Sequence, residues 1–311
     1  MKKSPTIICL IGPTAIGKTD LALKIASMFP IDIINVDSAQ IYRGMDIGTA
    51  KPSKEILNKH PHFLIDICNP EDTYSVGDFL FDASHQIKKS LNKNRIPLLV
   101  GGTMLYFHAL INGIADLPKS DKKIRTDIEK EAEEIGWKKM HLKLKNIDPT
   151  AAEKINCNDK QRIQRALEVF ELTGKPLSEF FKDQKNTKNY NFFNICLLPT
   201  NRDRLYQRIN SRFTKMLSDG LVDEVKNLLA SSNISPSNNS MKSIGYREIC
   251  AFIENKTTLE VAEQQATMAT RRLAKRQITW LRSLKRENSY DIFEKNLVKK
   301  IHEQISQEFK L

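Results

Sequence analysis

The sequence predicts an α/β fold, in which a P-loop-type parallel sheet with helices on both faces is interrupted by an inserted all-helical domain. Short apolar runs rich in β-branched residues recur between helical patterns, which is typical of buried parallel strands. A phosphate-binding signature, residues 12–19, follows the first of these runs directly. From about residue 116 to residue 190 the strand signal disappears and charged helical patterns replace it.

The expected elements follow from these patterns in chain order. Strands are predicted at 6–11, 31–36, 63–67, 96–100 and 192–198. Helices are predicted at 18–28, 122–135, 137–145, 149–155, 159–172, 201–218, 221–230, 244–253 and 259–284. Because a strand returns after the helical stretch, we expect a catalytic core of residues 1–115 and 191–311 and a helical insertion of residues 116–190, with 184–190 as its exit linker.

The composition narrows the class of protein. The chain has 49 Lys and Arg against 37 Asp and Glu, a formal charge of +12, which favours a polyanionic partner. Its five cysteines form no C-x-x-C pair, so we expect reduced thiols. No apolar stretch approaches the 18 or so residues of a membrane span. We therefore expect a cytoplasmic protein with no membrane partner.

Residues 12–19 read GPTAIGKT and fit the motif G-x-x-x-x-G-K-[ST]. Two glycines let the backbone curl so that N–H groups point at phosphate oxygens, and the following helix adds its positive dipole end. Lys18 supplies a charge, and the hydroxyl of Thr19 is a ligand for Mg²⁺. Nucleotide-binding and ATP-binding proteins share this loop. The expected diphosphate contacts are Gly12, Pro13, Thr14, Ala15, Ile16, Gly17, Lys18 and Thr19.

Three clusters of polar or small residues follow predicted strands: the phosphate loop, residues 37–40 and residues 101–103. Ligands of parallel sheets collect at the carboxyl ends of the strands, so these clusters should converge on one cleft. Asp37 has three possible roles at this stage. It is a ligand of Mg²⁺ or water in an NTPase, a general base toward a second substrate, or a cap of the next turn.

Basic residues recur at helical spacing in three places. In the helix from residue 201, Arg204, Arg208, Arg212 and Lys215 share one face. This face is either a solvated stripe or a place from which Arg208 reaches a diphosphate on the side opposite Lys18. Arg162 and Arg165 lie together in the insertion, and Arg271, Lys275 and Arg282 form a ridge near the C-terminus. Together these residues suit the phosphates of a folded RNA.

Six segments resemble, in the same order, signatures of the tRNA dimethylallyltransferase (isopentenyltransferase) family. They are GPTAIGKT at 12–19, DSAQIYRGMDIGTAKP at 37–52, GGTMLY at 101–106, RIQRALEV at 162–169, SIGYRE at 243–248 and ATRRLAKRQITW at 269–280. The sequence departs from the family pattern at Ile16, where Ser is frequent, and at Met104, where Gly is frequent. Neither departure removes a charged group.

The resemblance implies transfer of a dimethylallyl group from dimethylallyl diphosphate to N6 of the adenosine immediately 3′ of the anticodon in tRNA. Diphosphate is released and Mg²⁺ is required. It implies that Asp37 is the base, that Lys18, Thr19 and Arg208 stabilise the diphosphate, and that Thr103 lies beside the scissile oxygen. The protein is expected to act as a monomer.

The resemblance also implies contacts with the anticodon stem-loop. The residues concerned are Asp37, Ser38, Ala39, Gln40, Thr103, Arg125, Gln161, Arg162, Ile163, Gln164, Arg165, Ser243, Ile244, Gly245, Tyr246, Arg247 and Glu248. Two other functions share the phosphate loop: a small-molecule or nucleotide kinase, and an RNA-binding NTPase for which Asp66 is the candidate Mg²⁺ ligand.

Overall fold

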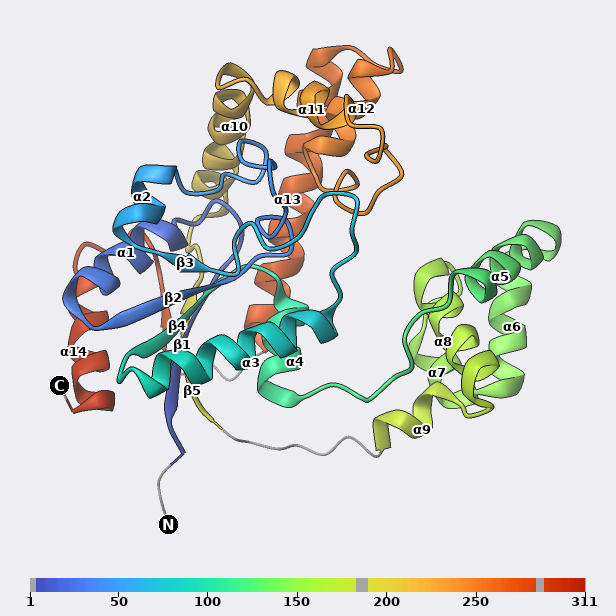
Figure 1. The fold of residues 1–311 in the computed structure, drawn as a ribbon, viewed down its shortest axis with the longest axis horizontal. Helices are drawn as coiled ribbons and strands as arrows, with labels where there is room; N and C mark the ends of the chain where they lie inside the picture. Colours follow the sequence, from blue (N-terminus) through green and yellow to red (C-terminus); the bar gives the residue numbers. More distant parts are fainter. Residues whose placement is uncertain (1–3, 183–189, 284–287, 311) are drawn as a thin grey trace. The chain divides into compact units, whose positions relative to one another are not determined.

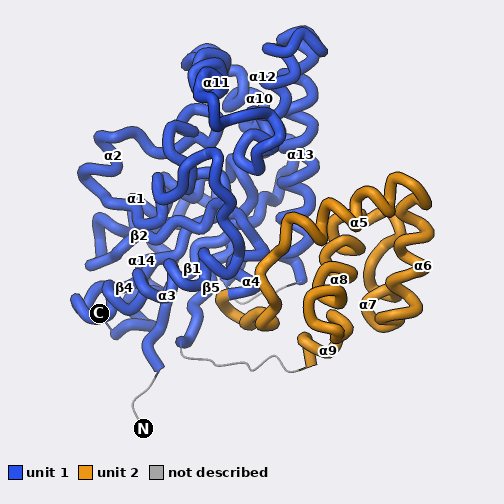
Figure 2. The backbone as a smooth tube through the Cα atoms, turned by 45° about the vertical axis from the view of Figure 1, so that its right-hand side comes forward, with its two compact units in different colours: residues 1–109, 189–311 blue, residues 110–188 orange. Residues whose placement is uncertain are grey.

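The structure, a computed structural model, describes residues 4–182, 190–283 and 288–310. The chain divides into two compact units, residues 1–109 with 189–311 and residues 110–188 (Figure 2). The first boundary falls inside helix α4 (Met104–Asn112), a few residues before the boundary expected from the sequence. Most of the exit linker expected at 184–190 lies outside the described residues.

The first unit is built on a parallel sheet (Figure 1). Its described strands are β1 (Thr6–Ile11), β2 (Ile31–Val36), β3 (His62–Phe63), β4 (Ile96–Gly101), β5 (Asn191–Leu197) and β6 (Ser289–Tyr290). They lie in the order β3-β2-β4-β1-β5-β6, and every pairing is parallel. Gly101 pairs with both Ile11 and Val36, so β1, β2 and β4 end at the same level. The predicted fold class is confirmed.

Helices cover both faces of this sheet. Apolar side chains of α1 (Lys18–Met28) and α14 (Leu297–Phe309) join one core cluster with β1, β4 and β5. The amino-terminal half of α10 (Arg202–Ser218) and the carboxyl-terminal half of α13 (Leu259–Ser283) complete that cluster. Helix α3 (Val76–Asn92) packs against β2 and β4.

A second apolar cluster lies beyond the carboxyl ends of the strands. It joins residues 41–50 to the distal half of α10, to α11 (Leu221–Leu229), to α12 (Tyr246–Ile253) and to the start of α13. Residues 41–50 contain no regular element, yet Ile41 and Met45 are fully enclosed. The loop that follows Asp37 therefore has a packed helical support.

The second unit contains helices only among its described residues. They are α5 (Lys122–Ile135), α6 (Trp137–Ile147), α7 (Pro149–Lys154), α8 (Lys160–Thr173) and α9 (Leu177–Lys182). An apolar core of its own includes Ile128, Leu144 and Ile163. Most charged residues of these helices stay on the outside, which explains the alternation of charged and apolar residues in the sequence, whereas Asp148 and Glu168 are buried.

Several elements differ from the prediction. The strand expected at 63–67 ends after Phe63, because Leu64 and Asp66 adopt positive φ angles of 65° and 56° that leave the extended region. The two-residue strand β6 was missed, as were α3, α4, α9, α14 and α2 (Lys54–Lys59). In the described part of the chain, no helix combines the length and the apolar character that crossing a bilayer requires.

Candidate active site

A cavity of about 340 Å³ opens at the carboxyl ends of β1, β2 and β4. This size suits a small-molecule substrate. Its walls come from the phosphate loop, the segment after β2, the end of β4 and helix α10. The lining residues are Thr14, Ala15, Gly17, Lys18, Thr19, Asp20, Asn35, Asp37, Gln40, Thr49, Ala50, Pro52, His62, Val100, Gly101, Arg208 and Arg212. All three clusters predicted to converge contribute to this wall.

The phosphate loop is held in a tight turn between β1 and α1. Gly17 has φ of 103°, which an L side chain rarely adopts, and it forms the amino-terminal cap of α1. The ammonium of Lys18 donates to the carbonyls of Gly12 and Pro13 at 3.0 and 2.9 Å, so its charge is held inside the loop. Burial lowers the pKa of Lys18 to about 8, and the negative charge of Asp37 opposes this shift.

Gln277 of α13 fixes the phosphate loop from outside. Its Oε1 accepts from the N–H of Thr14 at 2.9 Å, and its Nε2 donates to the carbonyl of Gly102 at 2.7 Å. The side chain is almost fully buried. One amide thus ties the loop after β1 to the loop after β4, and the Thr14 N–H is occupied by this bond.

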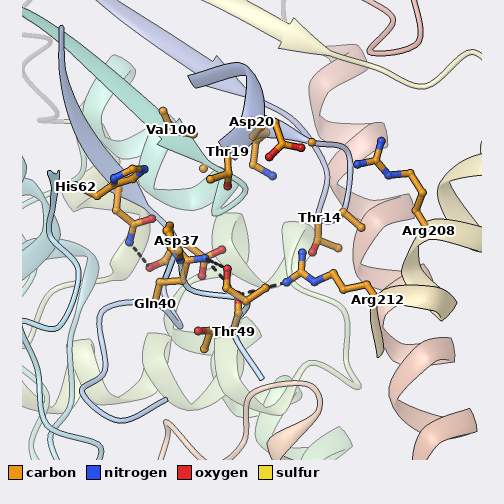
Figure 3. Close-up of a pocket in the computed structure, with 17 residues that line it drawn as sticks. Thr14, Thr19, Asp20, Asp37, Gln40, Thr49, His62, Val100, Arg208 and Arg212 are labelled. Carbon is orange, nitrogen blue, oxygen red and sulfur yellow. Dashed lines mark hydrogen bonds between the residues drawn. The ribbon is translucent and has the colours of Figure 1, made fainter. Parts of the chain in front are cut away.

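Asp37 lies immediately after β2 and faces the cavity, as Figure 3 shows. Its Oδ1 accepts from the N–H of Ala39 at 2.9 Å. This bond caps the turn after β2, which was the third possible role of Asp37. It also fixes the direction of the carboxylate. A side chain held in this way presents its charge to the cavity without rotating away, so the cap does not exclude a role in proton transfer.

Two arginines of α10, one turn apart, reach the cavity from the side of the helix (Figure 3). Arg208 lies against the phosphate loop, since a Cβ added to Gly17 would be 3.3 Å from its Nη2, and its guanidinium covers the ring of Phe293 at 5.9 Å. Arg212 donates to the carbonyl of Thr49 at 3.3 Å. Burial lowers the pKa of Arg212, and Asp37 opposes this. The sequence included Arg212 in the basic stripe but did not predict it as a site residue.

Thr103 lies beside the segment after β2 and does not line the cavity. Its hydroxyl accepts from the N–H of Ser38 at 3.0 Å and donates to the Ser38 hydroxyl at 3.3 Å. This bridge links the loop after β4 to the loop after β2. Ser38 is exposed, and Ala39 and Gln40 are half-buried. A place for Thr103 next to a scissile oxygen remains a prediction.

The arginines predicted in the helical unit differ in their surroundings. Arg125 makes two bonds to the fully buried Glu168, at 2.9 and 3.1 Å, and Arg165 donates to the same carboxylate at 2.6 Å. These arginines neutralise a buried charge, so loss of either is expected to destabilise the unit. Arg162 is different, because 72% of its side chain is exposed. Gln161 is exposed as well, and Gln164 is half-buried.

One aliphatic and one aromatic side chain predicted to contact tRNA are enclosed instead. Ile163 is fully buried in the core of the helical unit, and Tyr246 is fully buried beneath residues 46–48. Their side chains face away from solvent because one belongs to the apolar stripe of α8 and the other begins α12 against a packed loop. Neither side chain is accessible from outside the protein in this structure.

The other residues of the SIGYRE segment vary in exposure. Gly245 and Glu248 are buried, Ser243 and Ile244 are half-buried, and Arg247 is exposed. Glu248 accepts from the N–H of Gly245 at 2.8 Å and pairs with Arg247.

Within the ridge predicted near the C-terminus, Arg271 is turned toward α10, where it donates to Asn210 at 2.9 Å and covers the ring of Tyr206.

The oxygen atoms that line the cavity suit a magnesium ion whose other ligands come mainly from a bound substrate. In the described residues, no group of three or more His, Cys, Asp and Glu side chains is placed to hold a metal. The Thr19 hydroxyl and the carboxylates of Asp20 and Asp37 nevertheless line the same wall. Mg²⁺ keeps several waters and uses one or two protein oxygens together with phosphate oxygens, so these residues fit such an ion.

Two protein-family models match this chain. The model described as IPP transferase matches residues 40–284, and the model described as isopentenyl transferase matches residues 5–69. The tRNA dimethylallyltransferase of Nitrosomonas europaea is 46% identical over 300 residues, 96% of this chain and 95% of its own length. That of Coxiella burnetii is 46% identical over 303 residues, 97% of each chain.

Solved structures agree with these matches. The tRNA isopentenylpyrophosphate transferase of Bacillus halodurans superimposes with a TM-score of 0.71 at 35% identity, over 99% of this chain and 97% of its own. A eukaryotic dimethylallyltransferase crystallised while acting on tRNA gives a TM-score of 0.79 at 28% identity, over 97% of this chain and 78% of its own.

Proposed function

Because the chain belongs to the IPP transferase family, the family of the tRNA dimethylallyltransferases, we propose that it moves a dimethylallyl group from dimethylallyl diphosphate to N6 of the adenosine immediately 3′ of the anticodon. Membership confirms the resemblance carried by the six sequence motifs. The enzyme is a tRNA prenyltransferase. The prenyl donor, the modified atom and the metal are the parts that we add.

One observation carries the proposal: a carboxylate and three cationic groups face the same small cavity. Lys18, Arg208 and Arg212 supply the positive charge, and Asp37 supplies the carboxylate. A phosphoryl-transfer enzyme and a prenyltransferase both need the cations. The carboxylate held directly after β2, within the electrostatic reach of Lys18 and Arg212, suits a nucleophile that must lose a proton.

The proposed reaction is a displacement at the allylic carbon. The N6–C1 bond forms, the C1–O bond to diphosphate breaks, and the proton of the attacking amine passes to Asp37. The exocyclic amine of adenine is a weak nucleophile because its lone pair is delocalised into the ring. A carboxylate fixed by the Ala39 N–H can take that proton without first losing orientational freedom.

Charge builds on the diphosphate oxygens as that bond breaks. Lys18 and Arg208, which both lie against the phosphate loop, stabilise it, and Arg212 adds a buried charge nearby. Mg²⁺, held by Thr19 and the substrate oxygens, would neutralise further negative charge. In this use the phosphate loop holds a leaving group. The adenine must leave the stack of the anticodon loop to enter the cavity, which costs less in a loop than in a duplex.

Incubation with unmodified tRNA, labelled dimethylallyl diphosphate and Mg²⁺ tests this function. The expected result is label in tRNA, located on N6 of that adenosine by nuclease digestion and mass spectrometry. A parallel reaction with ATP separates the kinase and NTPase functions. Phosphate transfer or steady hydrolysis of ATP, with no label in tRNA, would show that the proposal is wrong. Asp66, the ligand that an NTPase would need, pairs with Lys51 at 2.6 Å and does not line this cavity.

The pKa of Lys18 predicts how the reaction depends on pH. The protonated ammonium attracts diphosphate, and its pKa of about 8 lies far below the ordinary 10.5. As pH rises through about 8 the free enzyme loses this charge, so kcat/KM for dimethylallyl diphosphate should fall by about tenfold per pH unit. Bound diphosphate raises the pKa, so kcat should fall only at higher pH. A kcat/KM that stays constant from pH 7 to 9.5 would contradict this role for Lys18.

Arg162→Ala tests the proposed RNA contact of the helical unit. We expect weaker tRNA binding and a dependence of log Kd on log salt that is less steep by about 0.7 for one lost phosphate contact. Filter binding across a salt series measures this slope. Arg165 is left intact in this test because its loss would uncover the buried Glu168. Lys89→Ala, an exposed cation of α3, is the matched control, and equal slopes for both variants would remove Arg162 from the interface.

A further inference from the structure

Glu224 of α11 lies outside the cavity but holds the loop that forms one of its walls. Its carboxylate accepts from three consecutive backbone N–H groups, those of Asp46, Ile47 and Gly48, at 2.9, 2.7 and 3.1 Å. The hydroxyl of Tyr246 donates a fourth bond at 2.6 Å. Each carboxylate oxygen therefore has two donors, in the manner of an anion bound by a backbone nest.

This packing depends on a glycine. A Cβ added to Gly48 would lie 2.5 Å from the ring of Tyr246, so only glycine lets the buried ring approach the loop closely enough for its hydroxyl to reach Glu224. Burial and the neighbouring charge of Glu224 raise the pKa of Tyr246, which keeps the phenol a hydrogen-bond donor.

The next two residues of the loop carry the effect into the cavity. Thr49 and Ala50 line it, and the carbonyl of Thr49 accepts from Gln40 at 3.2 Å and from Arg212 at 3.3 Å. The carbonyl of Ala50 accepts from Gln40 at 3.3 Å. Glu224 fixes the N–H groups of residues 46–48. Because Thr49 and Ala50 follow directly, the position of these N–H groups determines the direction of the two carbonyls.

We propose that Glu224 is a positioning residue for catalysis, which acts by fixing residues 46–50 so that Thr49 and Ala50 hold Gln40 and Arg212 at the reaction centre. This inference rests on the proposed function. Its effect should appear in the chemical step, because Glu224 does not line the cavity and the exposed cations of the helical unit are unchanged. A displacement of about 1 Å at a reaction centre is enough to slow a reaction by about 10²-fold.

Glu224→Gln is the direct test. The amide has the size of the carboxylate, but its NH2 group must face at least one backbone N–H donor whichever way the side chain is turned. We expect kcat for dimethylallyl transfer to fall by about 10-fold to 100-fold, with a much smaller change in the Kd for tRNA, at a temperature at which circular dichroism shows the variant folded. Asp223→Asn, the adjacent carboxylate with 79% of its side chain exposed, is the matched control and should keep the wild-type kcat.

Tyr246→Phe provides a second test that keeps the buried ring. Loss of one of four donors should lower kcat by about threefold, and the double variant with Glu224→Gln should be no slower than Glu224→Gln alone, since both changes act on one network. If wild type and Asp223→Asn label tRNA while Glu224→Gln and Tyr246→Phe label it equally fast, the positioning role is refuted and the proposed function stands. If the wild type itself fails to label tRNA, the proposed function fails.

Discussion

Asp37→Ala should lower the rate of prenyl transfer by about 10²–10⁴, the range for loss of a general base, with little change in tRNA affinity. The physical reason is that the amine entering the cavity loses its proton acceptor, whereas the cations that hold diphosphate remain. Single-turnover transfer and filter binding, measured on the same preparation, separate the two effects. Equal losses in both would show that Asp37 mainly positions RNA.

Asp37→Asn makes this test sharper because Asp37 also caps a turn. Asparagine keeps an oxygen that can accept from the Ala39 N–H, so the turn should survive, but its amide is not a base at neutral pH. We expect Asp37→Asn to be as slow as Asp37→Ala. If the asparagine variant kept its activity, the cap would be the main role of this residue. Glu308→Gln, an exposed carboxylate of α14, should behave as wild type.

Lys18→Met should lower kcat/KM for dimethylallyl diphosphate by about 10²–10³, the scale on which one aligned charge stabilises a transition state. Methionine nearly fills the space of the lysine stem but brings no charge to the leaving group. Isothermal titration with inorganic diphosphate should show the same loss of affinity, since product and leaving group are the same molecule.

The control for this variant is Lys24→Met, on the exposed side of the same helix. Both variants remove one positive charge from α1, so they change the overall attraction for tRNA equally. Only Lys18 faces the cavity. If the two variants lose the same activity, Lys18 acts through general charge and does not hold the diphosphate.

The sequence predicted those parts of the fold that local pattern determines. The strands β1, β2 and β4 are mainly apolar runs, buried throughout except for Thr6 at the start of β1, and the phosphate loop follows the first of them. The end of β3 was not predictable in this way, because Leu64 and Asp66 leave the strand through positive φ angles that apolar character does not reveal. Helix α3 was missed although Ser75 and Asp78 form a capping box, a recognisable start signal.

The site was predictable where one segment supplies it and less so where distant segments meet. Arg212 stood in the basic stripe of α10, but its distinction from Arg204, two turns earlier in the same stripe, depends on which turns of the helix lie at the cavity. Gln277 contacts Thr14 across 263 residues of sequence, and no local signal marks that pairing. Arg165 has, with Arg162, the spacing of an exposed basic face, and Arg125 was expected at the RNA from the resemblance alone. Both bind Glu168, whose burial only the folded unit reveals.

A structure with a non-reactive thio analogue of dimethylallyl diphosphate and Mg²⁺ tests the central claim most directly. The claim is that the phosphate loop holds the leaving group of a prenyl donor while Asp37 faces the carbon under attack. We predict both phosphates of the analogue between Lys18 and Arg208, with C1 directed toward the Asp37 carboxylate. A diphosphate bound outside the loop, or an Asp37 side chain turned away from C1, would contradict the account.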